Sequence, residues 1–379
     1  MTRAQSPRSR DALRVGLTVE QCWQRVPGGS ATYIVELAAA LLAEPGVAPV
    51  GLAAVHRGPP PPDFRLAIPV RSLGLPRAAL YRLWNRTPYP RAEWTVHHLD
   101  VIHATTWAIP ATRRPLVVTV HDLAFLRDPA HFTARGVRFF TRALERTRAQ
   151  AAVVIVPSRA TAADCIAAGI DAPRIHVVPH GVHPVTRAPD IAPDAAAPPT
   201  LPARYVLWCG TFEPRKNLSG LLDAFGLVAR EDPDLHLVLV GQPGWGGIQT
   251  LDVLHGKPWA ARVHHLGRLS NADLRLAYAR ATAFCFPSLW EGFGLPVLEA
   301  MSFGLPVVTS VGTSMAEVTG EAGILVEPTD PAQIARGILA ACGPDRARLA
   351  AAALDRSREF TWAQASALTA AAYAQATQS

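Results

Sequence analysis

Short apolar runs alternate with helix-forming segments along almost the whole chain. An apolar run that is bounded by turn residues and flanked by helical segments is typical of a buried strand in a βαβ unit, whose strands are parallel. In the first half the predicted strands are Leu13–Val19, Val47–Val55, Val101–Ala104, Leu116–Val120, Ala152–Val156 and Ile175–Val178. In the second half they are Tyr205–Cys209, Leu235–Val240, Val263–Leu266, Ala283–Phe286, Pro306–Thr309 and Ile324–Val326. The pattern predicts an α/β protein.

The length of 379 residues suggests two domains, because a single hydrophobic core rarely serves so long a chain. A segment rich in Pro and Ala without periodicity, 185–203, is interpreted as the linker between them. We expect domains at 13–184 and 204–360 that face each other across a cleft. Residues 1–12 are interpreted as a disordered tail, and 361–379 as a helix that crosses back to the first domain.

The composition restricts the class of protein. With 49% hydrophobic and 18% charged residues the chain is globular, and its apolar runs are too short to span a bilayer. The basic N-terminus has no apolar run behind it, so we expect no signal peptide. The five scattered cysteines have no metal-ligand spacing and indicate a reducing, cytoplasmic compartment.

The net charge of +7 suggests a nucleic acid, an anionic membrane or a phosphorylated substrate as partner. Neither half interleaves aromatic and basic residues on a strand, so we expect no nucleic acid. The segment 133–149 predicts an amphipathic helix with four arginines on one stripe, Arg135, Arg138, Arg142 and Arg146. This stripe suits an anionic membrane or a lipid phosphate, although a solvated basic face is the simpler interpretation.

Two carboxylates eight positions apart, Glu291 and Glu299, mark the segment PSLWEGFGLPVLEA. Glu291 is predicted in a glycine-containing loop after a strand, and Glu299 on the first turns of a helix that has Pro296 near its start. Glycines and a helix N-terminus present backbone N–H groups to a phosphate, and a carboxylate accepts both hydroxyls of a ribose. Two exposed carboxylates with no ligand are the alternative.

Two adjacent cations, Arg215 and Lys216, follow the first strand of the second half and precede a helix. They suit a diphosphate whose charge grows as its bond to carbon breaks. Cations at a helix N-terminus oppose the helix dipole, so a bound anion explains them better than a solvated helix start does.

The first half offers its own strand-end residues. Gly28 and Gly29 follow the first strand and open a helix, and His121 ends a later strand. Ligands of open parallel sheets bind at the carboxyl ends of strands, so both halves are expected to contribute to one composite site. An ordinary turn and a structural histidine are the alternatives for these two features.

The second half resembles the retaining glycosyltransferases of family 4. The resemblance runs through GTFEPRKN from Gly210, FPSLWEGFGLPVLEAMSFGLPVVTS from Phe286 and AGILVEPTDPAQIA from Ala322, and covers most of 205–335. The first half matches through GGSATY at Gly28, HD at His121, VPSRATAAD at Val156 and VPHGV at Val178. Two departures are His180, where the family often has Asn, and Ala316, where Pro is common. The resemblance implies the GT-B fold, in which two Rossmann-like parallel-sheet domains face a cleft.

The resemblance also implies roles for residues at matching positions. The implied catalytic residues are His121, Arg215, Lys216 and Glu291, with His121 beside the reacting carbon and the two cations on the donor diphosphate. The implied donor-binding residues are Gly29, Gly210, Arg215, Lys216, Leu269, Glu291, Phe293, Gly294, Leu295 and Glu299. Among these, Glu299 would hold the ribose, Glu291 would contact the transferred sugar, and Gly29 would lie near the diphosphate.

The resemblance implies a retaining, metal-independent hexosyltransferase, and the features above agree with a nucleotide-sugar site. This enzyme would move mannose or another hexose from a nucleotide-diphosphate sugar to a hydroxyl of a glycan, a glycolipid or a small molecule, with no cofactor. We expect a cytoplasmic enzyme, and peripheral contact with the inner face of the membrane is the alternative that the arginine stripe leaves open. A nucleotide-sugar hydrolase or epimerase of the same fold, and a non-catalytic nucleotide-sugar-binding protein, are the alternatives.

Overall fold

The computed structural model describes residues 12–96, 98–185, 201–242, 251–252 and 254–378. Most of the predicted tail and of the predicted linker lies outside the described residues. The first half contains one sheet of seven strands and the second half one sheet of six, and all neighbouring strands within each sheet are parallel. The prediction of an α/β fold with two parallel sheets is confirmed.

The first sheet has the strand order β3-β2-β1-β4-β5-β6-β7. Its strands are β1 Leu13–Thr18, β2 Val47–Ala53, β3 Val70–Ser72, β4 Val101–Ala104, β5 Leu116–Thr119, β6 Val153–Val156 and β7 Ile175–Val177. The helices of this half are α1 Gly28–Ala43, α2 Arg77–Trp84, α3 Ala124–Arg127, α4 Ala134–Gln150 and α5 Arg159–Ala167. The sequence prediction missed β3, because this three-residue edge strand is partly exposed and carries no apolar run.

The second sheet has the strand order β10-β9-β8-β11-β12-β13. Its strands are β8 Tyr205–Cys209, β9 His236–Val240, β10 Val263–His265, β11 Ala283–Phe286, β12 Val307–Ser310 and β13 Ile324–Val326. Six helices accompany or follow it among the described residues: α6 Leu218–Glu231, α7 Asn271–Arg280, α8 Leu295–Ser302, α9 Ser314–Thr319, α10 Pro331–Cys342 and α11 Arg346–Ser357. In both sheets the strand order reverses beside the first strand of the half, which is where ligands of doubly wound folds bind.

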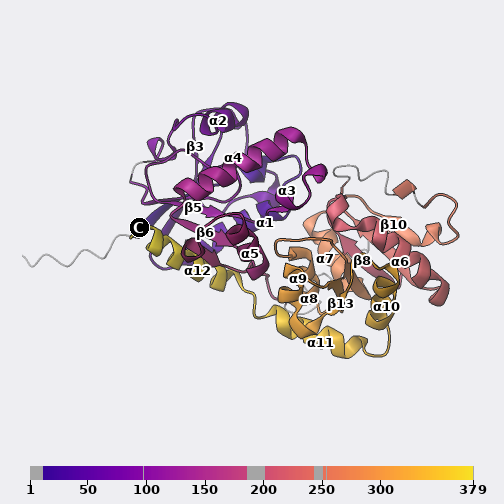
Figure 1. Ribbon diagram of the computed structural model, residues 1–379. Coiled ribbons are helices and arrows are strands. Elements are labelled where there is room, and N and C mark those ends of the chain that lie inside the picture. Colours follow the sequence, from indigo (N-terminus) through magenta and orange to yellow (C-terminus); the bar gives the residue numbers. More distant parts are fainter. Residues whose placement is uncertain (1–11, 97, 186–200, 243–250, 253, 379) are drawn as a thin grey trace, which may run out of the picture.

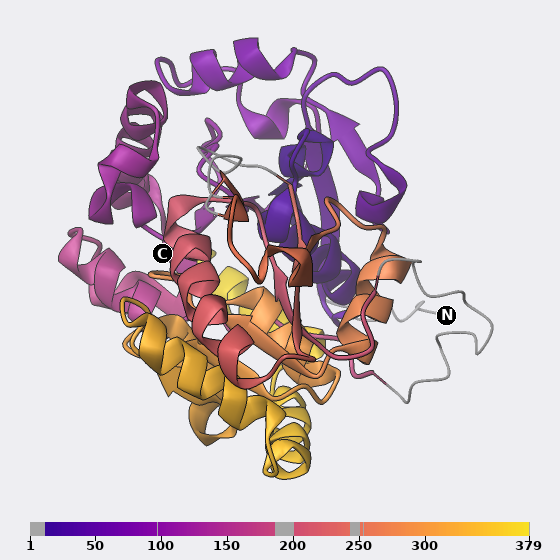
Figure 2. The ribbon, with the colours of Figure 1, turned by 90° about the vertical axis from the view of Figure 1, so that its right-hand side faces the viewer.

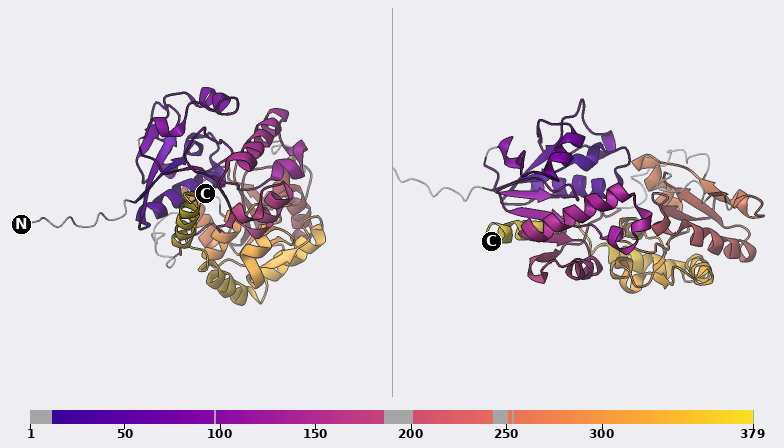
Figure 3. Two further views of the ribbon diagram at one scale, coloured as in Figure 1. Left: turned by 60° about the vertical axis from the view of Figure 1, so that its left-hand side comes forward. Right: turned by 45° about the horizontal axis from the view of Figure 1, so that its top comes forward.

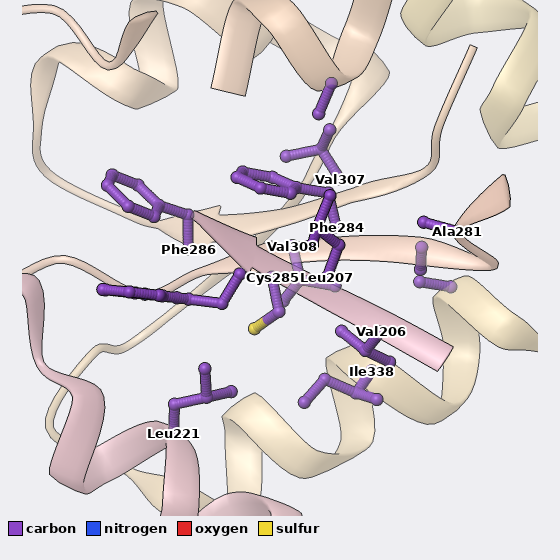
Figure 4. Close-up of a cluster of buried hydrophobic side chains, with 14 of the residues drawn as sticks. Val206, Leu207, Leu221, Ala281, Phe284, Cys285, Phe286, Val307, Val308 and Ile338 are labelled. Atoms are coloured by element: carbon purple, nitrogen blue, oxygen red, sulfur yellow. The ribbon is translucent and has the colours of Figure 1, made fainter. Parts of the chain in front are cut away.

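Helices cover both faces of each sheet, so the central strands are buried on both sides (Figure 1). In β11 the consecutive side chains Phe284, Cys285 and Phe286 are all fully buried. Figure 4 shows Cys285 on the side of the strand where Leu221 lies, and the two phenylalanine rings on the other side. This two-sided burial explains why the strand is a continuous apolar run rather than an alternating one.

The last helix, α12 Trp362–Ala376, returns to the first half and packs against α1 and β6. Figures 2 and 3 show the indigo-to-magenta first half beside the second half, and in Figure 3 the yellow C-terminal helix lies against the first half. The hydroxyl of Tyr373 lies 2.8 Å from Nδ1 of His103, which is buried in β4. This hydrogen bond ties the C-terminal helix to the centre of the first sheet.

The two chain segments that pass between the halves run side by side. The amide of Val182 donates to the carbonyl of Phe360 at 3.0 Å. A Cβ atom on Gly181 would lie 2.2 Å from the backbone nitrogen of Trp362, so only glycine permits this approach. The helices and strands described here include no helix that is long and apolar enough to cross a membrane.

Candidate active site

A cleft of about 500 Å³ lies between the two halves and is lined by residues that follow β1, β5, β8 and β11. Every residue predicted for the site lines this cleft: Gly29, His121, Gly210, Arg215, Lys216, Leu269, Glu291, Phe293, Gly294, Leu295 and Glu299. They come from segments far apart in sequence, and the carboxyl ends of the strands bring them together.

The loop that carries Arg215 and Lys216 is held by Asn217. This residue adopts a left-handed conformation, with φ of 53°, at the start of α6. Its side-chain amide donates to the carbonyls of Pro287 and Pro328, at 3.0 and 2.6 Å. Asparagine tolerates this conformation better than most residues, and its two N–H donors fasten the cation loop to the ends of β11 and β13.

Glu291 is buried and accepts hydrogen bonds from both cations. Arg215 Nη1 lies 2.8 Å from its Oε2, and the ammonium of Lys216 contacts its Oε1. The hydroxyl of Ser288 also donates to Oε1, at 2.8 Å, and Glu213 accepts from Arg215 Nε at 2.9 Å. The alternative of a solvated helix start is therefore wrong, since the cations are enclosed and paired within the protein.

These contacts set the charges of the cluster. Burial raises the pKa of Glu291, but the neighbouring Arg215 and Lys216 outweigh burial and bring it down to about 2. Burial lowers the pKa of Arg215, and the Glu291 and Glu213 carboxylates raise it by more, so the guanidinium stays protonated. Burial and the charge of Arg215 lower the pKa of Lys216. An added anion beside Lys216 would favour its charged form.

Part of the donor capacity of the two cations is unused within the described part of the chain. Arg215 makes its hydrogen bonds through Nε and Nη1, which leaves Nη2, and Lys216 uses one of its three N–H groups. Both residues line the cleft, so these donors are available to a ligand with several acceptor oxygens.

Glu299 lies on α8 in a different environment from Glu291. Its Oε2 accepts a hydrogen bond of 3.0 Å from the hydroxyl of Tyr278 on α7. Burial raises the pKa of Glu299 to about 7, against the opposing effect of that hydrogen bond. The two carboxylates therefore differ in partner and in the direction of their pKa shifts. Tyr278 is a contact that the sequence does not reveal, because it lies 21 positions away on another helix.

His121 donates from Nε2 to the carbonyl of Thr105 at 3.0 Å, which leaves Nδ1 as an acceptor. Burial lowers its pKa, so the ring is neutral near pH 7. Tyr33 packs edge-on against this ring, with centroids 4.8 Å apart. His180, one of the two departures from the family pattern, lies between Tyr33 and Phe293 and also lines the cleft.

The glycines of the cleft allow close backbone contacts. A Cβ atom on Gly292 would lie 1.8 Å from the carbonyl oxygen of His121, so the loop of the second half touches the strand end of the first. Gly294 has a φ of 97° at the start of α8, where other residues would be strained. Gly29 has no atom closer than 3.9 Å to its Cβ position, which leaves room for a ligand.

The arginine stripe of α4 is only partly as predicted. Arg135, Arg138 and Arg142 are exposed. Arg146 instead turns inward and donates to the carbonyls of Trp84, Ile109 and Pro110, at 2.6, 2.7 and 3.2 Å. The prediction that Arg146 belongs to a solvated basic face is therefore wrong. Helical spacing alone does not show which arginine will meet buried carbonyl groups.

The described residues contain no group of His, Cys, Asp or Glu side chains that could hold a metal ion. Two facing Rossmann-like domains with such a cleft between them are the arrangement of the GT-B fold. The chain matches the family model described as Glycosyltransferase Family 4 over residues 27–186, and that described as Glycosyl transferases group 1 over residues 203–343. The chain thus belongs to glycosyltransferase family 4.

Among curated proteins, the chain is similar to the O-antigen chain mannosyltransferase B of Escherichia coli, with 31% identity over 232 residues. This match covers 57% of the chain and 59% of that protein. A phosphatidyl-myo-inositol mannosyltransferase of Mycobacterium tuberculosis is 34% identical over 103 residues, which are 26% of each chain.

Solved structures share the fold along nearly the whole chain. Sucrose-phosphate synthase from Thermosynechococcus elongatus has a TM-score of 0.75 at 22% identity and covers 96% of this chain and 98% of its own. Anabaena HepE, in complex with UDP and glucose, has a TM-score of 0.70 at 21% identity, with 95% and 98% covered. WaaG, a glycosyltransferase involved in lipopolysaccharide biosynthesis, has a TM-score of 0.67 at 18% identity, with 94% and 98% covered.

Proposed function

We propose that this protein is a retaining hexosyltransferase that moves mannose from a nucleotide-diphosphate sugar to a hydroxyl of a glycan or glycolipid. The cleft-lining cluster of Arg215, Lys216 and Glu291 carries the proposal, because it offers unused cationic donors beside a fixed carboxylate. The mannosyltransferase relatives support the choice of sugar. Residues 204–360 would bind the donor and residues 13–184 the acceptor.

The donor diphosphate would lie against Arg215 and Lys216, with the backbone N–H groups that start α8 on its other side. Gly29 of the first half would face the same phosphates across the cleft. Binding there would add negative charge to a cluster whose two cations are balanced by Glu213 and Glu291. This anion would hold Lys216 in its charged form.

Glu299 would accept the two hydroxyls of the donor ribose, and Glu291 would face the transferred sugar. In the transfer step the acceptor oxygen bonds to the anomeric carbon as the bond from that carbon to the diphosphate oxygen breaks. The diphosphate leaves with the electron pair and takes the acceptor proton, on the face from which it departs. Arg215 and Lys216 would stabilise its charge by about 2–4 kcal/mol for each key donor.

His121 would act beside the reacting carbon as a neutral ring. Its Nε2–H is used by the Thr105 carbonyl, so the neutral ring would present the Nδ1 lone pair to a sugar hydroxyl. His121 would thus orient the sugar, and the leaving diphosphate would take the proton.

Replacement of Lys216 by Ala tests the catalytic proposal. We expect turnover of GDP-mannose or another nucleotide sugar to fall by about 10²-fold or more, while the folded structure survives. Lys257, an exposed lysine, provides the matched control, since Lys257→Ala should leave turnover unchanged. Unchanged turnover in Lys216→Ala would contradict the assignment.

A hydrolase or epimerase of the same fold would consume the donor without an acceptor. Product analysis with donor alone separates the two activities, because rapid loss of donor without acceptor favours the hydrolase or epimerase. A non-catalytic binding protein would show nucleotide affinity and no turnover with any acceptor.

The exposed face of α4 suggests how a glycolipid acceptor would be reached at the inner face of the membrane. Arg135, Arg138 and Arg142 are exposed there, and each such cation contributes about 1 kcal/mol near an anionic surface. Sedimentation with phosphatidylglycerol vesicles is expected to pull down the wild type. It should not pull down the triple Ser variant at these positions, and equal recovery of both would contradict membrane contact.

A further inference from the structure

The start of α5 in the first half is held by a carboxylate of the second half. Glu317 on α9 accepts from the backbone nitrogens of Arg159 and Ala160, at 2.9 and 2.7 Å. The two helices lie next to each other across the boundary between the halves (Figure 1). A carboxylate is well suited to this place, because the first N–H groups of a helix have no partner within the helix.

A second set of hydrogen bonds joins the same helix end to residues 287–294, the loop between β11 and α8 that carries Glu291. We call this segment the donor loop. The hydroxyls of Ser158 and Thr161 both donate to the carbonyl of Gly292, at 2.7 and 3.1 Å. Both side chains are buried. Gly292 also lies so close to the carbonyl of His121 that a Cβ atom could not fit.

We name Ser158, Thr161, Gly292 and Glu317 the interdomain clasp. The clasp acts on the segment that holds the proposed donor contacts, because Gly292 stands between Glu291 and Phe293. Helix α9 contributes twice to this arrangement, since Ser314 on the same helix donates to the carbonyl of Glu291 at 2.6 Å. The position of the donor loop relative to His121 therefore depends on hydrogen bonds from both halves.

We propose that Glu317 is a positioning residue, which fixes the position of the donor loop relative to His121. The proposal rests on the proposed function, since it assumes that His121 and Glu291 face one donor. Glu317 itself is absent from the cleft lining, so it would act through α5 and Gly292 rather than by touching the substrate. Small displacements of reacting groups reduce turnover strongly, and one of about 1 Å can cost about 10²-fold.

A carboxylate that only caps a helix should affect stability but not turnover. Asp330 is such a cap and serves as the comparison. Asp330 accepts from the backbone nitrogens of Ala332 and Gln333, at 2.9 and 3.1 Å, at the start of α10. It makes the same number of cap bonds as Glu317, but all its partners lie within the second half. Asp330→Ala therefore removes the same number of helix-cap hydrogen bonds and leaves the hydrogen bonds between the two halves in place.

The test compares Glu317→Ala, Glu317→Gln and Asp330→Ala in the full chain. For Glu317→Ala we expect kcat to fall by about tenfold or more. The Kd for the free nucleoside diphosphate should stay within about twofold of wild type, since its proposed partners Arg215, Lys216 and Glu299 all belong to the second half. Glu317→Gln keeps one acceptor oxygen and should give an intermediate kcat. Asp330→Ala should lower the melting temperature as much as Glu317→Ala does while kcat stays within about twofold.

Equal losses of kcat in Glu317→Ala and Asp330→Ala would overturn the proposal, as would an unchanged kcat in Glu317→Ala. Hydrogen exchange at the amides of Arg159 and Ala160 gives a readout that does not depend on turnover. Faster exchange in Glu317→Ala is expected if the clasp exists in solution, and unchanged exchange would overturn it. Failure of the proposed function shows separately, as a wild type with no nucleotide-sugar turnover but intact protection of these amides.

Discussion

Arg215 Nη1 and Glu291 Oε2 lie 2.8 Å apart although 76 positions separate them in the chain. The contact joins the loop after β8 to the loop after β11, which are neighbouring strands of the second sheet. Because Lys216 contacts the other oxygen of the same carboxylate, one buried anion holds two cations in place. The cation pair is therefore held in place by the protein's own carboxylate.

Removal of that anion should destabilise the fold. In Glu291→Gln, Arg215 and Lys216 lose the carboxylate that balances them in a buried site. We expect the free energy of unfolding in urea to fall by about 3–5 kcal/mol, the usual cost of breaking a buried ion pair from one side. Asp355→Asn is the control, since its pair with Arg358 is exposed and should contribute little. Equal stability of the two variants would contradict a structural role for the Glu291 carboxylate.

Gly29 should matter to the donor and not to the fold. A methyl group there meets nothing closer than Leu295 at 3.9 Å, so Gly29→Ala should keep the wild-type melting temperature. The same methyl group would intrude on a diphosphate that approaches the Gly29 backbone, so the KM for the nucleotide sugar should rise by about tenfold or more. Gly58→Ala, at another open position, should change neither quantity. An unchanged KM in Gly29→Ala would place the diphosphate elsewhere.

Nucleotide affinity should depend on pH through Glu299. The pKa of this carboxyl is raised by burial to about 7, so it is protonated in the folded protein below that pH. Ribose hydroxyls donate best to the ionised form, and affinity should weaken as pH falls, by about tenfold for each unit below 7. Calorimetric titration between pH 5.5 and 8 measures this dependence with an intact nucleotide-diphosphate sugar, because its diphosphate, esterified at both ends, has no second ionisation in this range. The Glu299→Gln variant should bind the nucleotide weakly, and its affinity should no longer depend on pH. If this variant kept the wild-type pH profile, another group would be responsible for the dependence.

The bond between Tyr373 and His103 should stabilise the contact of α12 with the first sheet. Tyr373→Phe leaves Nδ1 of the buried His103 without its partner, and the free energy of unfolding should fall by about 1–3 kcal/mol. Tyr89→Phe, which changes a half-exposed tyrosine, should have little effect. Chemical denaturation measures the free energy of unfolding of both variants. A wild-type value in Tyr373→Phe would show that the hydroxyl contributes nothing to the attachment of α12.

Much of the site was predictable because strand ends are local features. An apolar run such as Phe284 to Phe286 marks a buried strand, and in a parallel sheet the residue after the strand faces the cleft. Gly29, His121, Arg215 and Glu291 each follow a predicted strand, and all four line the cleft.

What the sequence by itself determined is every strand of the two sheets except β3, their parallel arrangement and the predicted site residues that line the cleft, since these depend on hydrophobic periodicity and on local turn chemistry. Only the tertiary structure decided how the charges are paired. Glu291 balances Arg215 and Lys216, Arg146 turns away from solvent, and Glu317 caps a helix of the other half. Which charged groups pair depends on which of them the fold brings close together and buries. A hydrogen bond between residues 158 positions apart produces no periodic pattern in the sequence, so the sequence does not predict it.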